Sequence, residues 1–459
     1  MSRVVVVGAG IAGLAAAYAL QRAGIEVLVL EKANAVGGRM QTVSEQGFTW
    51  DAGAQFMLSD YRFMPRLMAR LGVAFSTQPV PPLAATVLPD GRLHYVKAGS
   101  VAGVLRHPAL ALGSRARLAK LMWAAWRNRH RFDWYRPELV APIDTESLRT
   151  WGDRVVGQDA VDWLLSPPTA AFFFGDAHET PWWYAAALAW AAATGRSRVQ
   201  VPQGGMGAVP QALARYLDVR LGTTVQRVDV EPDGVVLLRT ETGAGRATLE
   251  AERVILATPA PVTLSLLPDP EGILGIEEAA FLRSTRYTCN LTTAVAYDRQ
   301  LESRAYGVHV PLASACALAA IGWEHVKDPG RVPPGNGLGV LMPTHRFSVQ
   351  RWDAPDQEIC AALSAEVQRF YPGGRAKPLF SRVRRWPHAM PVLYPGWSRA
   401  HARALAADKA AGRRVFTCGD YWLGPTTEQA LVSGLRAALA VLRSLGRAGT
   451  LTDELALVS

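Results

Sequence analysis

The feature that most constrains the fold is the opening stretch RVVVVGAGIAGLAAAYALQRAGIEVLVLE, residues 3–31. An unbroken β-branched run is typical of a parallel strand that is buried on both faces. Gly8, Gly10 and Gly13 follow with the spacing G-x-G-x-x-G, and an alanine-rich segment of helical character then runs to Gly24 before a second strand. The stretch therefore predicts a β-α-β unit, and with it an α/β fold that contains a parallel sheet.

The three glycines have separate physical roles in such a turn. The first allows the tight turn, the second lets the backbone approach a pyrophosphate, and the third lets helix and strand pack closely. The helix start at Ile11 and Ala12 then directs free N–H groups at the phosphates. Glu31, which closes the second strand and precedes Lys32, is placed to bind a ribose hydroxyl. We therefore predict a dinucleotide site at this turn.

Segments along nearly the whole chain resemble the flavin amine oxidase superfamily, which includes monoamine oxidases, protoporphyrinogen oxidases and carotenoid desaturases. The resembling segments are EKANAVGGRMQ (31–41), WDAGAQF (50–56), VPQGGMGAVPQALA (201–214), TTVQRVDV (223–230), VILATPA (254–260) and FTCGDYWLGPTTEQALVSGLRAA (416–438). The resemblance implies non-covalently bound FAD. Beyond the first turn, it implies cofactor contacts at Gly37, Gly38, Arg39, Gly53, Ala54, Gln55, Val225, Val228, Gly419, Asp420, Thr427 and Ser433.

Arg39 is the residue that the resemblance places at the FAD diphosphate. A guanidinium matches phosphate geometry with two parallel hydrogen bonds. A surface arginine in a salt bridge is the alternative interpretation. In the same resemblance, Asp420 contacts the ribityl-diphosphate region, and the helix start at Ser433 lies under the flavin ring.

Segments of nucleotide-binding type occur at the start, middle and end of the chain, so we predict two interleaved domains. The expected FAD-binding domain, Rossmann-like and of the GR2 type, comprises residues 1–64, 200–270 and 406–448. An α+β substrate domain is expected at residues 65–199 and 271–405, with a helical, tryptophan-rich part at about 100–195. Asp233-Gly234 predicts a hairpin turn, and the chain should close with a helix from about Glu428 to Leu445.

Three hallmarks of the classical amine oxidases can be checked against the sequence. Thr292 stands where many members carry a lysine, and Thr426 stands where a tyrosine of the amine-binding cage is expected. The segment RRWPHAMPVLYPGW contains no cysteine for covalent flavin attachment. A classical amine oxidase is therefore disfavoured.

Two segments resemble protoporphyrinogen oxidases instead, namely residues 146–176 and RWPHAMPVLYPG. This resemblance implies hydride removal from a bulky, largely apolar substrate, with formation of a C=C or C=N bond and oxygen or a quinone as electron acceptor. Open alternatives are an amine or amino-acid oxidase that yields an imine and hydrogen peroxide, a carotenoid-type desaturase, and a flavin-binding accessory protein without activity. Because a flavin performs the redox step itself, no dedicated acid or base is required.

Candidate pocket residues come from the segments that should run beside the flavin, although each could instead be ordinary core packing. They are Gln55, Phe56, Trp386, Met390, Tyr394, Trp422 and Thr426.

A formal net charge of +10 favours acidic partners or a phospholipid surface. Residues 114–140 combine arginines and lysine with Trp123, Trp126 and Trp134. This composition suits either a helix that lies on a membrane or an ordinary helix with a core face and a solvated basic face. No nucleic-acid motif accompanies it, and the scattered cysteines and histidines predict no metal site. Met1-Ser2-Arg3 leads directly into the first strand, so we expect a cytoplasmic protein, with the cytoplasmic face of a membrane as the alternative site.

Overall fold

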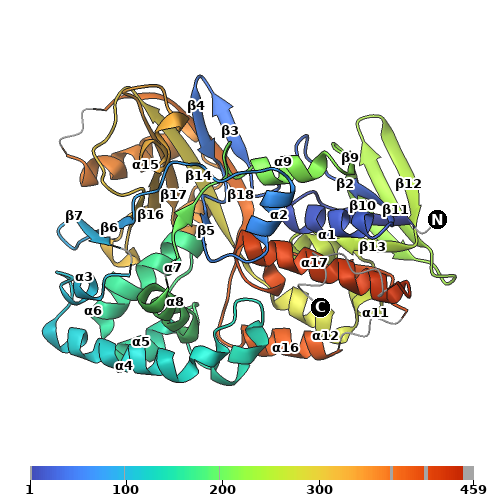
Figure 1. The fold of residues 1–459 in the computed structure, drawn as a ribbon, viewed down its shortest axis with the longest axis horizontal. Coiled ribbons are helices and arrows are strands. Elements are labelled where there is room, and N and C mark those ends of the chain that lie inside the picture. Colours follow the sequence, from blue (N-terminus) through green and yellow to red (C-terminus); the bar gives the residue numbers. More distant parts are fainter. Residues whose placement is uncertain (1–2, 98, 196, 373–375, 408–411, 448–459) are drawn as a thin grey trace.

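The computed structural model describes residues 3–97, 99–195, 197–372, 376–407 and 412–447. A five-stranded parallel sheet forms one end of the elongated molecule (Figure 1). Its strand order is β19 (Val415–Thr417), β13 (Arg253–Leu256), β1 (Arg3–Val7), β2 (Glu26–Leu30) and β9 (Asp218–Arg220). All five strands fall within the segments predicted for the FAD-binding domain, although residues 1–2, 408–411 and 448 of those segments lie outside the described residues.

Both faces of this sheet are covered, which explains why its inner strands β13, β1 and β2 consist mainly of apolar residues. Val4 and Val6 face the helices α1 (Ile11–Arg22) and α17 (Thr427–Ser444), whereas Val5 and Val7 face the opposite side. The predicted β-α-β unit and the predicted closing helix are confirmed.

On the opposite side lies the antiparallel sheet β10 (Thr224–Val230), β11 (Val236–Thr242) and β12 (Gly245–Ala251). The hairpin predicted at Asp233-Gly234 joins its first two strands, and Gly234 takes the positive φ of +87° that the turn requires.

A seven-stranded sheet extends from the centre of the molecule to the side away from the parallel sheet (Figure 1). Its order is β18 (Pro378–Pro391), β14 (Tyr287–Tyr297), β17 (Gly337–Pro343), β16 (Leu318–Trp323), β15 (Gly307–His309), β6 (Leu83–Val87) and β7 (Leu93–Lys97). The helix α15 (Asp356–Phe370) packs on one face, while the hairpin of β3 (Thr42–Glu45) and β4 (Phe48–Asp51) and the helix α7 (Ser166–Phe173) cover the other. The sequence pattern did not predict β6 and β7, because this short hairpin is fixed by its pairing with the distant β15.

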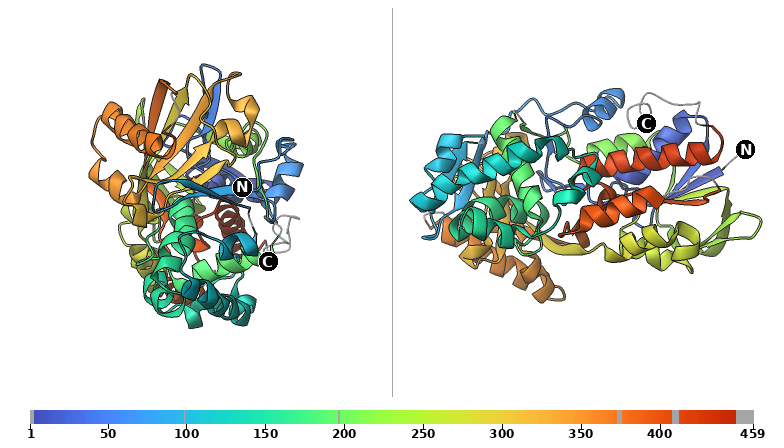
Figure 2. Two further views of the ribbon diagram at one scale, coloured as in Figure 1. Left: turned by 90° about the vertical axis from the view of Figure 1, so that its left-hand side faces the viewer. Right: turned by 90° about the horizontal axis from the view of Figure 1, so that it is seen from below.

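Helices lie beside the seven-stranded sheet in the same half of the molecule, below it in Figure 1 and in the left view of Figure 2. They are α3 (Val101–Leu105), α4 (Leu112–Asn128), α5 (Leu148–Val155), α6 (Gln158–Ala160), the π-helical turn at Val161–Leu165, α7 and α8 (Trp182–Thr194). One continuous apolar core runs from Trp151 and Trp182 of these helices to Val5 and Leu28 of the parallel sheet. Within the described residues, no helix is both long and apolar enough to cross a bilayer.

The remaining elements connect these parts. They are β5 (Met57–Leu58), α2 (Met64–Arg70), β8 (Val199–Gln200), α9 (Ala208–Ala214), α10 (Ala260–Leu266), α11 (Pro270–Leu274), α12 (Ile276–Ser284), α13 (Glu324–Lys327), α14 (His345–Gln350), α16 (Trp397–Ala407) and the 3-10 turns Arg129–Arg131, Pro137–Ile143, Leu312–Ser314, Pro329–Arg331 and Asp420–Trp422. The chain therefore passes between the two ends several times, and the cavity described next lies where these passages meet.

Candidate active site

A large cavity of about 2460 Å³ begins at the carboxyl ends of β1 and β2 and continues toward the helical part. Small-molecule pockets usually measure about 300–1,000 Å³, so this one has room for a cofactor and a large substrate together. Its lining changes along its length. Glycines and charged groups line the first end, and aromatic and aliphatic side chains line the other.

The glycine turn after β1 has the geometry that a bound pyrophosphate needs. A Cβ at Gly8 would lie 2.8 Å from the Ala257 carbonyl oxygen, and one at Gly13 would lie 2.1 Å from the Gly8 carbonyl oxygen. A Cβ at Gly10 would meet nothing within 4 Å, because this residue faces the open cavity. Among the described residues no side chain caps the start of α1, so its first N–H groups are free to bind an anion.

Glu31 lies beside this turn and is held by two backbone groups. Its Oε2 accepts a hydrogen bond from the Ala9 N–H and its Oε1 from the Ala33 N–H, each at 2.8 Å. Each carboxylate oxygen keeps a second acceptor position. The side chain is therefore fixed at the cavity wall and can still accept a hydrogen bond from a ribose hydroxyl.

Arg39 forms an ion pair across the cavity wall with Asp420. Its Nη1 lies 2.7 Å from Asp420 Oδ2 and its Nη2 lies 3.0 Å from Oδ1, while Nη1 also donates to the Ala389 carbonyl oxygen at 3.0 Å. Burial lowers the pKa of Arg39, but the Asp420 carboxylate outweighs burial and raises it above its ordinary value. The Nε–H and one Nη2–H have no partner within the described residues, so the guanidinium can still bind a phosphate oxygen.

The two glycines before Arg39 bring its turn against the first glycine turn. Gly37 has a φ of +110°, and its N–H donates to the Ala9 carbonyl oxygen at 2.8 Å. Gly38 has a φ of +55°, and a Cβ there would lie 3.3 Å from Gly10 Cα. The two turns thus form one backbone-lined cradle.

The loop after β4 continues this wall toward the ring-lined end. A Cβ at Gly53 would lie 2.2 Å from the Arg39 carbonyl oxygen, and the Ala54 N–H donates to that same oxygen at 2.8 Å. Gln55 Nε2 donates to the carbonyl oxygens of Asp51 at 2.7 Å and Gly53 at 2.8 Å. Trp386 Nε1 donates to the Ala52 carbonyl oxygen at 2.8 Å, which anchors β18 to the loop.

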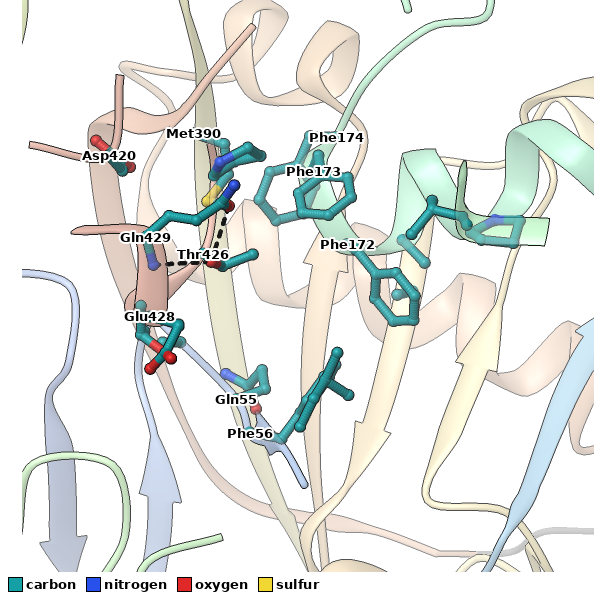
Figure 3. A pocket seen from close by; sticks show the side chains of 18 of the residues that line it. Gln55, Phe56, Phe172, Phe173, Phe174, Met390, Asp420, Thr426, Glu428 and Gln429 are labelled. Atoms are coloured by element: carbon teal, nitrogen blue, oxygen red, sulfur yellow. Dashed lines mark hydrogen bonds between the residues drawn. The ribbon is translucent and has the colours of Figure 1, made fainter. Parts of the chain in front are cut away.

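The helix α17 starts at the same wall. Thr426 is its N-cap, with Oγ1 accepting a hydrogen bond from the Gln429 N–H at 3.1 Å, and both line the cavity together with Met390 and Glu428 (Figure 3). Glu428 accepts hydrogen bonds from the backbone N–H groups of residues 62–64 at 2.6–2.8 Å and from the Tyr135 hydroxyl at 2.9 Å.

Aromatic rings line the other end of the cavity (Figure 3). Phe172 contacts Phe56 edge-on at 5.6 Å and His309 at 5.2 Å between ring centroids, and Phe56 contacts Tyr306 at 6.4 Å. Burial lowers the pKa of His309 to about 4, so this imidazole is neutral at physiological pH. The apolar wall therefore carries a neutral polar group beside these rings.

Most of the predicted cofactor residues line this cavity. They are Gly8, Gly10, Ile11, Ala12, Glu31, Lys32, Gly37, Gly38, Arg39, Gly53, Ala54, Gln55, Val225, Gly419, Asp420 and Thr427. Gly13, Val228 and Ser433 lie behind the lining. Gly13 packs α1 on the glycine turn, Val228 is in the core, and the Ser433 hydroxyl accepts a hydrogen bond from the Gly419 N–H at 2.9 Å.

Five of the seven candidate pocket residues, namely Gln55, Phe56, Trp386, Met390 and Thr426, also line the cavity. Tyr394 and Trp422 do not, and the prediction for these two needs correction. Trp422 packs between Phe281 and His401 and donates from Nε1 to Thr417 Oγ1 at 2.9 Å. Tyr394 packs against the apolar core, and Arg286 lies 5.2 Å from its ring centroid.

Thr292, the residue aligned with the amine oxidase lysine, lies in the cavity wall. Its hydroxyl donates to Asn290 Oδ1 at 2.8 Å, so it is engaged with its own strand. Sequence reasoning missed Phe172, Tyr306, His309 and Glu428. The run FFFGD was a visible signal for the first, but strand and helix patterns contain no information on which core rings face a cavity.

The parallel sheet, its glycine turns and the adjoining ring-lined space define a dinucleotide-dependent oxidoreductase. The model of the family described as flavin containing amine oxidoreductase matches residues 11–442, and the chain belongs to this family. It is an FAD-dependent oxidoreductase, and FAD is its cofactor. The backbone cradle, the free donors of Arg39 and the free acceptor positions of Glu31 fit the diphosphate and ribose of this cofactor.

Relatives with known names cover nearly the whole chain. The coproporphyrinogen III oxidase of Mycobacterium bovis is 28% identical over 96% of this chain and 97% of its own length. The L-amino-acid oxidase of Siganus canaliculatus is 25% identical over 95% and 84%. Among solved structures, cyclohexylamine oxidase from Brevibacterium oxydans superposes with a TM-score of 0.75 at 18% identity, covering 97% of this chain and all of that one, which shows the shared fold.

Proposed function

We propose that this protein removes a hydride from a bulky, largely apolar substrate of the porphyrinogen type and forms a C=C or C=N bond. The observation that carries the proposal is the ring-lined end of the cavity, which continues directly from the cofactor cradle. The similarity to a coproporphyrinogen III oxidase over nearly the full length supports it.

FAD, when bound, accepts the hydride and later passes the electrons to an acceptor, for which we propose oxygen or a quinone. The protein binds and orients the substrate, and it excludes water from the site. The rings of Phe56 and Phe172 supply apolar contact for a large macrocyclic substrate. Trp386 and Gln55 brace the loop that separates the substrate end from the cradle.

An amine or amino-acid oxidase is the second candidate, favoured by the similarity to an L-amino-acid oxidase. Thr292 and Thr426 weigh against it, because neither can supply the ammonium group or the aromatic face of a classical amine site. Both line the cavity.

Anaerobic bleaching of the bound flavin tests the two candidates side by side. The panel comprises protoporphyrinogen, coproporphyrinogen, several primary and secondary amines, and L-amino acids. Rapid bleaching by a porphyrinogen alone is expected. Bleaching by an amine or amino acid alone would overturn the proposal, and peroxide formed after air is admitted would identify oxygen as the acceptor.

We further propose that residues 114–140, which comprise most of the helix α4 and the segment after it, contact the cytoplasmic face of a membrane from which an apolar substrate enters. Trp123 and Trp126 are 59% and 51% exposed, and Leu112 at the helix start is 80% exposed. Arg127 and Arg129 lie over the two indole rings at 5.4 and 4.8 Å, which places cations beside the exposed apolar surface. Leu118 and Leu121 on the other face pack into the core.

Liposome co-sedimentation tests this contact. The double variant Trp123→Ser/Trp126→Ser should lose binding to anionic vesicles, whereas Ile276→Ser, which removes an apolar residue 69% exposed on α12, should retain it. Unchanged binding by the double variant would leave α4 as an ordinary surface helix.

A further inference from the structure

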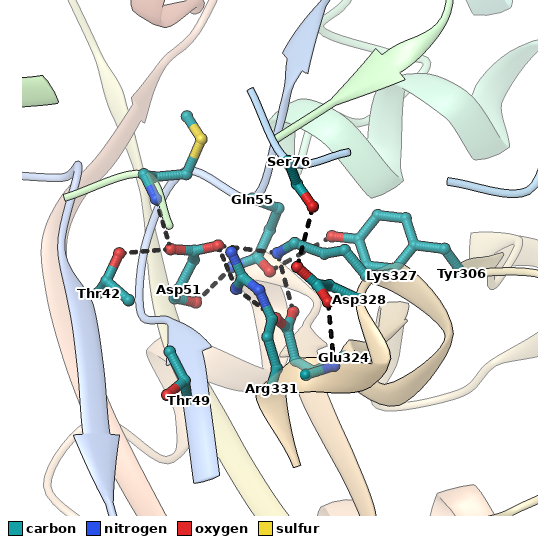
Figure 4. A network of polar contacts seen from close by, with 12 residues as sticks. Thr42, Thr49, Asp51, Gln55, Ser76, Tyr306, Glu324, Lys327, Asp328 and Arg331 are labelled. Atoms are coloured by element: carbon teal, nitrogen blue, oxygen red, sulfur yellow. Dashed lines mark hydrogen bonds and ion pairs between the residues drawn. The ribbon is translucent and has the colours of Figure 1, made fainter. Parts of the chain in front are cut away.

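Four charged side chains are buried together behind the loop that follows β4, residues 52–56, which we call the cofactor loop (Figure 4). Lys327 Nζ lies 2.9 Å from Asp51 Oδ2 and 3.0 Å from Glu324 Oε1. Arg331 Nη1 lies 2.7 Å from Asp51 Oδ2 and 2.6 Å from Glu324 Oε2. Three of the side chains are fully buried and Arg331 is 6% exposed. We call these residues the charge cluster, whose formal charges sum to zero.

The charge cluster joins three distant segments of the chain. Asp51 Oδ1 accepts hydrogen bonds from Thr42 Oγ1 at 2.7 Å and from the Met206 N–H at 2.8 Å, so all of its acceptor positions are used. A Cβ at Gly205 would lie 2.4 Å from Thr42 Oγ1, which shows how closely the segment approaches. Burial acts to raise the pKa of Asp51, but the two cations outweigh burial and hold it below its ordinary value.

Two contacts connect the charge cluster to the cavity. The Asp51 carbonyl oxygen accepts the Gln55 side-chain amide, and the Tyr306 hydroxyl lies 3.5 Å from Gln55 Oε1. Lys327 Nζ lies 5.2 Å from the centroid of the Tyr306 ring, within the range of a cation–π contact. Gln55 and Tyr306 both line the cavity. The charge cluster is therefore separated from the cavity by one layer of side chains.

Stability alone gives no reason for this arrangement. Replacing buried ion pairs with apolar residues of similar volume is often neutral or stabilising, whereas removing one partner leaves an uncompensated charge and costs about 3–5 kcal/mol. Charges interact more strongly in a protein interior than in water, so a net charge on the cluster would change the electrostatic potential inside the cavity. The position of the charge cluster behind the cofactor loop and its zero net charge therefore point to a role toward the cofactor.

We propose that the charge cluster is the electrostatic support of the cofactor loop, and that its zero net charge sets the reduction potential of the bound flavin. Lys327 is a positioning residue that acts through Tyr306 and Gln55. The proposal rests on the FAD cofactor of the family and is independent of the proposed substrate. Reduction by hydride adds negative charge to the cofactor, so an excess of positive charge behind the loop favours the reduced form and an excess of negative charge disfavours it.

Anaerobic equilibration of the purified holoprotein with a reference dye tests the proposal without any substrate. Glu324→Gln leaves a net positive cluster and should raise the ratio of reduced to oxidised flavin at least tenfold, which equals about 30 mV for a two-electron couple. Lys327→Met leaves a net negative cluster and should lower the ratio by a similar factor. The double variant Glu324→Gln/Lys327→Met is neutral again and should return within about threefold of the wild type.

Asp162→Asn is the matched control, because it removes one carboxylate from a half-buried pair with Arg149 that does not line the cavity. Its potential should be unchanged. A merely structural role would shift both single variants in the same direction or not at all, and either result overturns the proposal. If Lys327→Met does not fold, Glu324→Gln and the double variant still decide, since the first must shift the potential and the second must restore it.

Discussion

The two ends of the cavity are built from different parts of the amino acids. At the cofactor end the wall is backbone, brought close at Gly8, Gly13 and Gly53, where an added Cβ would lie 2.1–2.8 Å from a carbonyl oxygen. At the substrate end the wall is side chain, with Phe172 in edge contact with its neighbouring rings at 5.2 and 5.6 Å. A backbone wall admits few substitutions, whereas a wall of rings can change its shape by exchanging one side chain.

This difference explains how one fold can keep its cofactor while its substrate changes. Function resides in sites carried on a fold, and the two sites here have different tolerance to substitution. The cofactor end depends on close approaches that only glycine permits. The substrate end depends on filled volume, which several combinations of side chains satisfy.

The largest effect is expected from a substitution at Gly434, where α17 crosses α1. A Cβ there would lie 2.0 Å from the Ala12 carbonyl oxygen, and its three nearest atoms all belong to the Ala12 backbone. Gly434→Val should therefore lose about 3 kcal/mol or more of unfolding free energy and retain no FAD. Chemical denaturation and flavin absorbance measure the two effects. Gly113→Val on α4, where a Cβ would meet nothing within 4 Å, is the control and should retain its flavin.

Arg39→Ala should give the next largest effect. The variant removes a phosphate donor and leaves the Asp420 carboxylate, 7% exposed, without its cation. A hydrogen bond to a charged group such as phosphate contributes about 1.5–3 kcal/mol, so the FAD dissociation constant should rise about 100-fold. Arg382→Ala, which removes an exposed arginine paired with Glu45, should bind FAD normally. Wild-type flavin occupancy in Arg39→Ala would refute the cofactor assignment.

Lowering the pH should decrease the free energy of unfolding through the protonation of His309. The pKa of this imidazole falls from about 6.5 in the unfolded chain to about 4 in the fold because of burial. Between these values only the unfolded state binds the proton, so the free energy of unfolding should decrease as the pH falls from 6.5 to 4, by roughly 2 kcal/mol. His309→Gln should flatten this slope, and the exposed His178→Gln should not. An unchanged slope in His309→Gln would contradict the prediction.

Phe172→Ala should give the smallest effect, and it should change substrate binding without changing FAD binding. Loss of one ring from the wall should raise KM about fivefold to tenfold for the compound that bleaches the flavin fastest, which corresponds to about 1 kcal/mol. Its FAD dissociation constant should remain that of the wild type, because the ring does not contact the cradle. A large loss of FAD affinity in this variant would show that the two ends are not independent.

The cofactor end was largely predictable from the sequence, and the reason is physical. A backbone wall needs glycine at fixed spacing, so Gly8, Gly10, Gly13, Gly37 and Gly38 identify it without knowledge of the fold. The β-α-β unit follows from local patterns for the same reason. The pairing of Arg39 with Asp420 was not predicted, because contacts between residues so far apart in the sequence leave no local signal.

The substrate end was predicted less well. Tyr394 and Trp422 belong to the segments expected to flank the flavin, but the turn at Asp420–Trp422 directs the Trp422 indole into the core beside His401. The charge cluster was missed as well. WEHVKDPGR shows Glu324, Lys327 and Arg331 at a spacing that is usual for a solvated helix face, and only the packing of β4 and β16 around it reveals that the group is buried.

The order of the parallel sheet has a consequence for how the protein is made. Its edge strand β19 and the helix α17 come from the last part of the chain, yet they complete a cradle whose first turn follows β1. While the chain is still being translated, the glycine turn lacks Asp420 and the helix that packs on α1. Cofactor capture should therefore wait until α17 has been synthesised, and a chain truncated before Asp420 should not retain flavin.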